Sequence, residues 1–258
     1  MNKAPLILMY HGIKTDPLSI PEGREIGASL YDVPLENFKS QMFWLKTNDY
    51  QTISVDEINF RNQDKQVILT FDDGEANNFI HAFPILRKLN FKAYFFVIVD
   101  RIGKPGYIDW NELYQLYEAG MIIGSHSLTH PILTNLTPHQ VEDELYNSLK
   151  YLVNYLGSQV DAFSIPRGFC NDQIIQTAYT AGYKQVFISE RPDDLTLKCW
   201  ERIAVKGSWD IERFEQAIRG EKPINEQIFY QAKKTAKKFL KGASYNQLRK
   251  IMLNITQF

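Results

Sequence analysis

The adjacent carboxylates Asp72 and Asp73 stand in the segment Thr70-Phe71-Asp72-Asp73-Gly74, directly after a hydrophobic run. In an α/β barrel the carboxyl ends of the strands carry the active site, so both side chains would lie there. Two adjacent carboxylates repel each other when both are ionised, and a bound cation relieves that repulsion. One aspartate would then bind the cation while the other acts as a base, although Asp-Asp-Gly is also an ordinary turn sequence.

Two histidines four residues apart, His126 and His130, follow a second apolar run. If this turn is helical, both imidazoles face the same side and can bind one metal ion. Taken alone, the pair is better interpreted as two surface histidines at the start of a helix. With Asp73 it makes three protein ligands and leaves a position open for water, which is typical of catalytic metal sites.

Short β-rich runs alternate with helical patterns along the chain. This alternation predicts parallel strands joined by crossover helices, and these elements would position the residues named above. Capping patterns at 109–112 and 137–140, and cap residues Asn171 and Asp210, mark four helix starts. A chain of 258 residues that is 44% hydrophobic can bury one large core. Strands are expected at residues 7–10, 66–71, 93–99, 121–123, 162–165, 185–188 and 199–205.

Composition excludes some functions. With 29 Lys and Arg against 30 Asp and Glu, the net charge of -1 provides no field for binding phosphate backbones, so no nucleic-acid partner is expected. No run approaches the ~20 apolar residues of a membrane span, and the start lacks the pattern of a signal peptide. Cys170 and Cys199 form no Cys-x-x-Cys motif and suit a reducing compartment at least as well as an oxidising one. We therefore expect a cytoplasmic protein.

The composition changes from Asn225 onward, where apolar residues at helical spacing are accompanied by a set of lysines. We expect a catalytic domain over 1–220 and a helical extension over 221–258 that packs on it. The basic face would be solvated, and weak contact with an anionic membrane surface is the alternative. The lysines are Lys233, Lys234, Lys237, Lys238 and Lys241.

Residues 70–74 and 126–130 resemble the first two motifs of the polysaccharide deacetylases, which include chitin, peptidoglycan and poly-N-acetylglucosamine deacetylases. The resemblance covers about residues 5–215 and includes 83–86, 93–97 and 163–168. It implies a deformed (β/α)7 barrel, here followed by the C-terminal helical extension. It also implies a Zn²⁺ site, or one for Co²⁺, Ni²⁺ or Mn²⁺, made by three ligands: Asp73, His126 and His130.

The same resemblance implies a role for each remaining site residue. Asp72 would be the general base for a water that attacks the acyl carbon. A backbone N–H of the turn Pro166-Arg167-Gly168 would stabilise the oxyanion. Arg202 resembles an arginine found late in many relatives and would orient Asp72 through a charge-assisted bond. A surface ion pair is the alternative interpretation of Arg202.

Three departures from the family pattern matter. Relatives usually carry Tyr in place of Arg167, and many carry Arg in place of Ser164, so the pocket wall differs. Most members take their general acid from a late histidine, but no histidine follows His139. His11, at the end of the first strand, would supply the acid, as in the N-terminal Tyr-His segment of the poly-N-acetylglucosamine deacetylase branch. A packed strand-end histidine is the alternative, and we expect no catalytic role for His81 or His139.

The sequence therefore predicts a metal-dependent hydrolase that removes an N-acetyl or other acyl group from an amino sugar. Its partner would be an N-acylated amino sugar or glycan precursor of cell-surface glycan synthesis. A sugar-binding pseudoenzyme would be expected to have lost a ligand or the base, and none is missing. A deformylase or an O-acyl esterase would keep every one of these residues, so these alternatives stay open.

Overall fold

A parallel sheet that curves into a nearly closed barrel forms the centre of the molecule, as the deformed-barrel prediction required. The computed structural model describes residues 6–15, 21, 24–25, 27–59 and 65–221. Within them the sheet has the strand order β10-β9-β8-β7-β6-β5-β1-β11. These strands are β1 (Leu6–Tyr10), β5 (Gln66–Phe71), β6 (Tyr94–Val97), β7 (Ile122–Ser125), β8 (Ala162–Ser164), β9 (Gln185–Ile188), β10 (Trp200–Glu201) and β11 (Ile203–Ala204).

One short stretch of chain brings the two edges of this sheet together. β10 pairs with β9 at one edge and β11 pairs with β1 at the other. Only Arg202 separates β10 from β11, and its backbone N–H donates to the carbonyl of Ile188 over 3.0 Å. The barrel is therefore closed through Arg202, the residue that sequence analysis assigned to the site.

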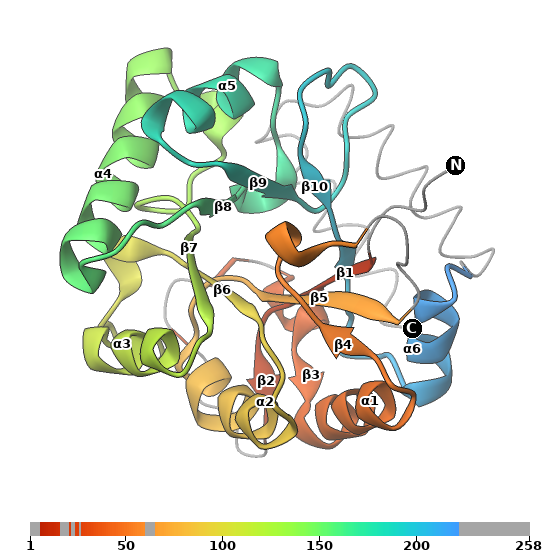
Figure 1. Cartoon of the computed structure of the whole chain (residues 1–258). Coiled ribbons are helices and arrows are strands. Elements are labelled where there is room, and N and C mark those ends of the chain that lie inside the picture. Colours follow the sequence, from red (N-terminus) through yellow and green to blue (C-terminus); the bar gives the residue numbers. More distant parts are fainter. Residues whose placement is uncertain (1–5, 16–20, 22–23, 26, 60–64, 222–258) are drawn as a thin grey trace.

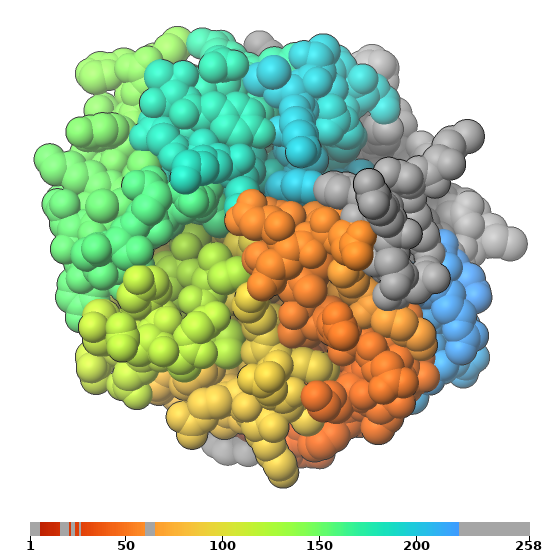
Figure 2. Space-filling model, viewed as in Figure 1, coloured from red at the N-terminus to blue at the C-terminus, as the bar shows by residue number. Residues whose placement is uncertain are grey.

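Helices cover the outside of the strands, as crossover connections between parallel strands require. Figure 1 shows α1 to α6 arranged around the sheet, and Figure 2 shows successive chain segments in successive sectors of one face. Residues 189–199 join β9 to β10 without an α-helix, which is one source of the deformation. The helices are α1 (Leu35–Thr47), α2 (Phe83–Leu89), α3 (Trp110–Glu118), α4 (Pro138–Leu156), α5 (Asp172–Ala181) and α6 (Ile211–Ile218).

Several short elements complete the described chain. β2 pairs with β3 in a separate sheet, and β4 pairs with β5. These elements are β2 (Ile13–Lys14), β3 (Val33–Pro34), β4 (Gln51–Thr52), the 3-10 helices η1 (Ala28–Tyr31), η2 (Val55–Glu57), η4 (Val99–Arg101), η5 (Leu133–Asn135) and η6 (Pro166–Gly168), and the π-helix η3 (Asn78–Ala82).

The predicted strands and caps are confirmed. Each of the seven predicted strand regions contains a strand, with β10 and β11 sharing the last. Asp109 accepts from the backbone N–H of Glu112 over 2.7 Å, and Thr137 opens α4 through the same kind of capping box. Helix α1 was not predicted, because it begins after Pro34 without a side-chain cap and so carries no start signal. Of the predicted helical extension over 221–258, only residue 221 is among the described residues, so the extension stays a prediction.

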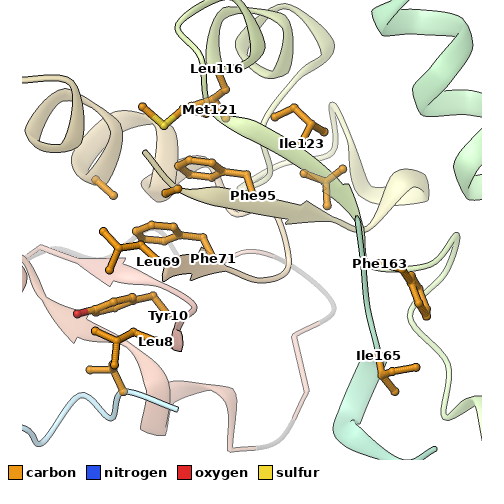
Figure 3. Close-up of a cluster of buried hydrophobic side chains, with 14 of the residues drawn as sticks. Leu8, Tyr10, Leu69, Phe71, Phe95, Leu116, Met121, Ile123, Phe163 and Ile165 are labelled. Atoms are coloured by element: carbon orange, nitrogen blue, oxygen red, sulfur yellow. The ribbon is translucent and has the colours of Figure 1, made fainter. Parts of the chain in front are cut away.

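Alternate residues of the strands pack on opposite faces of the sheet, which is the period of two expected of a strand. Leu8, Leu69 and Phe95 join a large cluster that includes helix residues such as Leu116. In Figure 3 these side chains lie between the strands and the helices, in rows that cross neighbouring strands. The rings of Phe71 and Phe95 stack with centroids 4.9 Å apart. This outer core fixes each helix against its strand.

A smaller cluster occupies the opposite face of the sheet, inside the barrel. Ile7, Ile68 and Phe96 belong to it, and none of its buried members comes from α1 to α6. The rings of Phe96 and Phe187 have centroids 5.0 Å apart. The guanidinium carbon of Arg202 lies 5.5 Å from the centre of the Phe96 ring. The inner core therefore packs against the guanidinium of Arg202.

Candidate metal centre

The register of the strands brings the predicted site residues to one edge of the barrel. Phe71 lies opposite Tyr10, and the backbone N–H of Asp72 donates to the carbonyl of Tyr10 over 3.0 Å. His126 follows the end of β7 and donates its backbone N–H to the carbonyl of Val97 over 2.8 Å. Both residues therefore stand one step past the carboxyl ends of their strands, where α/β barrels place active sites.

Asp73, His126 and His130 converge on one point. Their ligand atoms all lie within 4.8 Å of one another, and all three residues are buried. The Nε2 atoms of His126 and His130 lie 3.5 Å and 3.6 Å from the same oxygen of Asp73, Oδ1. Two imidazole nitrogens and one carboxylate oxygen suit a divalent transition metal and leave coordination positions open.

The other nitrogen of each imidazole is occupied in the way a metal site requires. Nδ1 of His126 lies 2.8 Å from the carbonyl oxygen of Ser164, so it carries the proton and leaves the Nε2 lone pair toward Asp73. Nδ1 of His130 lies 2.7 Å from Oε1 of Glu25. Burial lowers the pKa of His126 to about 4, which keeps this ring neutral at neutral pH. The residues present therefore fit a divalent cation.

The loop that carries both histidines is not helical, so the helical turn considered for it is wrong. Ser127 has φ 65 and His130 has φ 68, both in the left-handed region. Glu144 of α4 holds the loop by accepting from the backbone N–H groups of Leu128 and Thr129 over 3.0 Å and 2.9 Å. The histidines converge because of this turn geometry and not because of helical spacing.

Asp72 lies beside the metal ligands and is paired with Arg202. Nη1 donates to Oδ1 and Nη2 to Oδ2, each over 2.7 Å, and both residues are buried. A surface ion pair, the alternative interpretation of Arg202, is therefore wrong. Burial alone would raise the pKa of Asp72, but the charge of Arg202 lowers it well below its usual range. Asp72 is ionised at neutral pH.

Ser164 and Thr70 complete the surroundings of the Asp72–Arg202 pair. Nη2 of Arg202 donates to the hydroxyl of Ser164 over 2.8 Å, and Nη1 to the hydroxyl of Thr70 over 3.1 Å. The Ser164 hydroxyl in turn donates to Oδ2 of Asp72 over 3.2 Å. A small residue at 164 therefore gives Arg202 room to reach the carboxylate from the closing strand.

His11 lies at the end of β1, on the same edge of the barrel, as expected. Its ring stacks on Tyr31 with centroids 5.0 Å apart. Nδ1 is buried and has no hydrogen-bond partner among the described residues.

The turn predicted to bind the oxyanion, Pro166-Arg167-Gly168, forms the 3-10 helix η6 directly after β8. Arg167 has φ 61, and its Nη1 lies 3.7 Å from Oε1 of Glu25. The turn therefore contacts the residue that holds His130. The role of its backbone N–H groups stays a prediction.

Sequence reasoning missed two residues that hold this centre, Glu25 and Glu144. Partial burial would raise the pKa of Glu25, but the hydrogen bond to His130, followed by the charges around it, lowers this pKa to about 2. Glu25 lies in a stretch without periodicity, and Glu144 lies on an amphipathic helix among other acidic residues. Neither position shows a sequence pattern that marks a site residue, because each contacts the loop of His126 and His130 from another segment of the chain.

Comparison with known proteins agrees with this geometry. The sequence profile described as polysaccharide deacetylase matches residues 60–186. The Bacillus subtilis protein YxkH, which is assigned by name to the polysaccharide deacetylases, is 33% identical over 190 residues, or 71% of this chain. The chain belongs to the polysaccharide deacetylase family. It spans 64% of the length of YxkH, less than two thirds.

Two further members of the family show how far the likeness extends. The poly-beta-1,6-N-acetyl-D-glucosamine N-deacetylase of Staphylococcus epidermidis is 27% identical over 208 residues, covering 70% of this chain and 71% of that protein. A polysaccharide deacetylase structure from Bacillus cereus superposes with a TM-score of 0.70 at 26% identity, covering 84% of this chain and 69% of that one. In the described part of the chain, no helix is both long and apolar enough to cross a membrane.

Proposed function

We propose that this polysaccharide deacetylase family member is a metal-dependent hydrolase that removes the N-acetyl group from an amino sugar of a glycan or glycan precursor. The observation that carries the proposal is the buried group Asp73, His126 and His130 beside an ionised carboxylate, Asp72. Relatives named as deacetylases of peptidoglycan N-acetylglucosamine and of poly-beta-1,6-N-acetyl-D-glucosamine support the substrate class.

Asp73, His126 and His130 would hold Zn²⁺, Co²⁺, Ni²⁺ or Mn²⁺. When bound, the cation supplies a Lewis acid that polarises an acyl oxygen and makes a nearby water more acidic. Asp72 takes the proton from that water, because it is ionised and lies beside the ligands: its Oδ2 is 3.8 Å from Nε2 of His126. Arg202 fixes the direction of the carboxylate and lowers its basicity, so orientation is its main contribution.

Breaking the amide requires a proton donor, since an amine is a poor leaving group until it is protonated. His11 would supply this proton: it follows β1, and no described hydrogen bond occupies its Nδ1. The imidazole side chain is a frequent proton donor in enzymes, which suits this role. His11 would give its proton to the leaving nitrogen as the C–N bond breaks.

The turn Pro166-Arg167-Gly168 would present a backbone N–H to the oxygen on which negative charge develops. Arg167 in the left-handed region turns the chain sharply at the end of β8, next to the Ser164 carbonyl that holds His126. A backbone donor does not depend on the side chain, so Arg167 in place of the usual tyrosine leaves this role intact.

The chemistry of the acyl group and the compartment are further parts of the proposal. Hydrolysis of a formyl amide or an O-acyl ester would use the same residues. Only assays with different substrates can therefore distinguish a deacetylase from a deformylase or an esterase. We propose a cytoplasmic glycan precursor, because Cys170 and Cys199 suit a reducing compartment at least as well as an oxidising one. Fractionation of cells that produce the protein at its natural level would test the compartment.

The decisive experiment measures acyl release by the zinc-loaded protein. N-acetylated β-1,4 and β-1,6 glucosamine oligosaccharides, peptidoglycan fragments, nucleotide-linked and lipid-linked sugars, an N-formyl sugar and an O-acetyl sugar would be compared. We expect acetate and free amine in equal amounts from at least one N-acetyl sugar, and orders of magnitude less with Asp72→Asn. Acetate release that is unchanged in Asp72→Asn, or no release from any N-acetyl sugar, would contradict the proposal.

A further inference from the structure

Glu25 joins a metal ligand to two arginines at the edge of the barrel. Its Oε1 lies 2.7 Å from Nδ1 of His130, 3.5 Å from Nη2 of Arg101 and 3.7 Å from Nη1 of Arg167. We propose that Glu25 is a positioning residue for the metal centre: it holds the His130 ring and its tautomer so that Nε2 faces the cation. The inference rests on the metal site of the proposed function, but not on the acyl substrate.

The physical reason is the proton on the ring of His130. A carboxylate accepts hydrogen bonds and donates none when ionised, so Nδ1 must carry the proton and Nε2 keeps its lone pair. The negative charge also makes the imidazole a more basic ligand. Without Glu25 the proton can move to Nε2, and each cation that binds must then displace it.

The distances indicate that His130, and not an arginine, is the main partner of Glu25. Of these three contacts among described residues, the one to His130 is at hydrogen-bond length, because 3.5 Å and 3.7 Å exceed the usual range of 2.7–3.2 Å. The two guanidiniums, Arg101 and Arg167, lie around the carboxylate as charges. They stabilise its ionised form without taking its place on the imidazole.

The preceding residue, Arg24, explains how the chain keeps Glu25 in place. Its guanidinium is buried, forms an ion pair with Asp32, and lies 2.8 Å from Oε1 of Glu75. Glu75 comes two residues after the ligand Asp73, so this anchor attaches the segment to the loop that carries the metal ligand. Two adjacent side chains, Arg24 and Glu25, thus contact the two loops that supply the metal ligands.

Close packing under the anchor supports a fixed position for this segment. A Cβ on Gly12 would lie 2.6 Å from Oδ1 of Asp32 and 2.9 Å from Oε2 of Glu75. Real contacts of Cβ atoms are longer, so the carboxylates approach the backbone as only glycine permits. The two partners of Arg24, Asp32 and Glu75, therefore pack closely against the chain that follows β1.

Zinc affinity tests the inference directly, by competition with a chromophoric chelator on the full chain. Glu25→Ala should bind zinc about 10–100-fold more weakly than the wild type, the usual effect of losing such a partner. Glu25→Gln keeps an oxygen acceptor without the charge, so its zinc affinity should lie between those of the wild type and Glu25→Ala. This variant also provides the test if Glu25→Ala does not fold. Arg101→Gln removes a neighbour of Glu25 and should stay close to the wild type, as should Glu36→Gln, an exposed control.

The tautomer of His130 gives a second readout that needs neither metal nor activity. In the metal-free protein labelled with ¹⁵N-histidine, the wild type should show a proton on Nδ1 of His130, and Glu25→Ala should show it shifted toward Nε2. Equal zinc affinity in Glu25→Ala and wild type, or an affinity that falls as far in Arg101→Gln, would overturn the inference. A wild type that binds no zinc would instead overturn the metal site of the proposed function, while the tautomer would still decide whether Glu25 sets His130.

Discussion

The candidate metal centre has an inner half and a rim half that are held by different kinds of contact. In the inner half, Asp72 and His126 stand at strand ends and contact Arg202 and the backbone carbonyl of Ser164, which belong to the same sheet. In the rim half, His130 lies in a left-handed turn and contacts the carboxylate of Glu25, from a segment 105 residues away. The register of the barrel therefore fixes His126, and the side chain of a distant segment fixes His130.

This difference has consequences for energy and for function. The inner half contains the buried ion pair of Asp72 and Arg202. Removing either residue leaves the charge of the other buried and uncompensated. The rim half is partly exposed: the side chains of Glu25 and Arg167 have 19% and 17% of their surface accessible. We expect changes in the Asp72–Arg202 pair to act on folding and chemistry, and changes of Glu25 to act on metal affinity.

The largest effect on stability should come from Arg202→Met. Asp72 would become a buried carboxylate without its guanidinium, and breaking such a pair costs about 3–5 kcal/mol of unfolding free energy. Urea denaturation would measure the loss. A second change, Asp72→Asn in the same chain, should recover much of it, because no unpaired charge remains.

The pH dependence of Arg202→Met sharpens this prediction. Burial raises the pKa of Asp72 once the guanidinium is gone, so the folded variant gains stability as the pH falls from 8 toward 5 and the carboxylate is protonated. In the wild type the pKa of Asp72 is lowered, so its contribution is complete above the unfolded value of ~3.9 and constant over this range. A loss of less than about 1 kcal/mol at pH 8 would show that the inner half is not held by this ion pair.

A large effect on catalysis without a loss of metal should come from His11→Ala. A positioned proton donor contributes ~10²–10⁴-fold, so kcat for an N-acetyl sugar should fall by that factor while the zinc content stays at the wild-type level. An O-acetyl sugar, with its better leaving group, should be affected less. An amide rate equal to that of the wild type would remove His11 from the mechanism.

A smaller effect should come from Glu144→Ala, which removes the acceptor that holds the loop between the two histidines. The backbone N–H groups of Leu128 and Thr129 would lose their partner, at a cost of about 1–2 kcal/mol in the metal-free protein. Thermal or urea unfolding with and without zinc would measure it. Glu142→Ala, an exposed change on the same helix, serves as the control, and equal stabilities of the two variants would contradict the role of Glu144.

The sequence predicted the inner half well, because strand ends are marked by apolar runs. The runs before Asp72 and His126 showed where each strand stops, and parallel strands bring their ends to one edge. Arg202 was placed correctly beside Asp72, but its burial was not foreseen, because nothing local shows that residues 200–204 close the barrel. The closing strand is defined by its pairing with β9 and β1, which are distant in sequence.

The rim half was predicted only in part. The spacing of His126 and His130 pointed to a shared ligand role, but the helical turn considered for it was wrong, because Ser127 and His130 adopt left-handed backbone conformations. Glu25 was missed, because its contact with His130 depends on the anchor at Arg24 and on no periodic pattern. Contacts between side chains of distant loops leave no signal in a single sequence.

The most direct test of the account is the metal content of four purified proteins, measured by elemental analysis with folding checked by circular dichroism. The account predicts one divalent ion per chain in the wild type and in Asp72→Asn, and none in Asp73→Ala or His126→Ala. Stoichiometric metal in Asp73→Ala and His126→Ala, or loss of the metal in a folded Asp72→Asn, would contradict it.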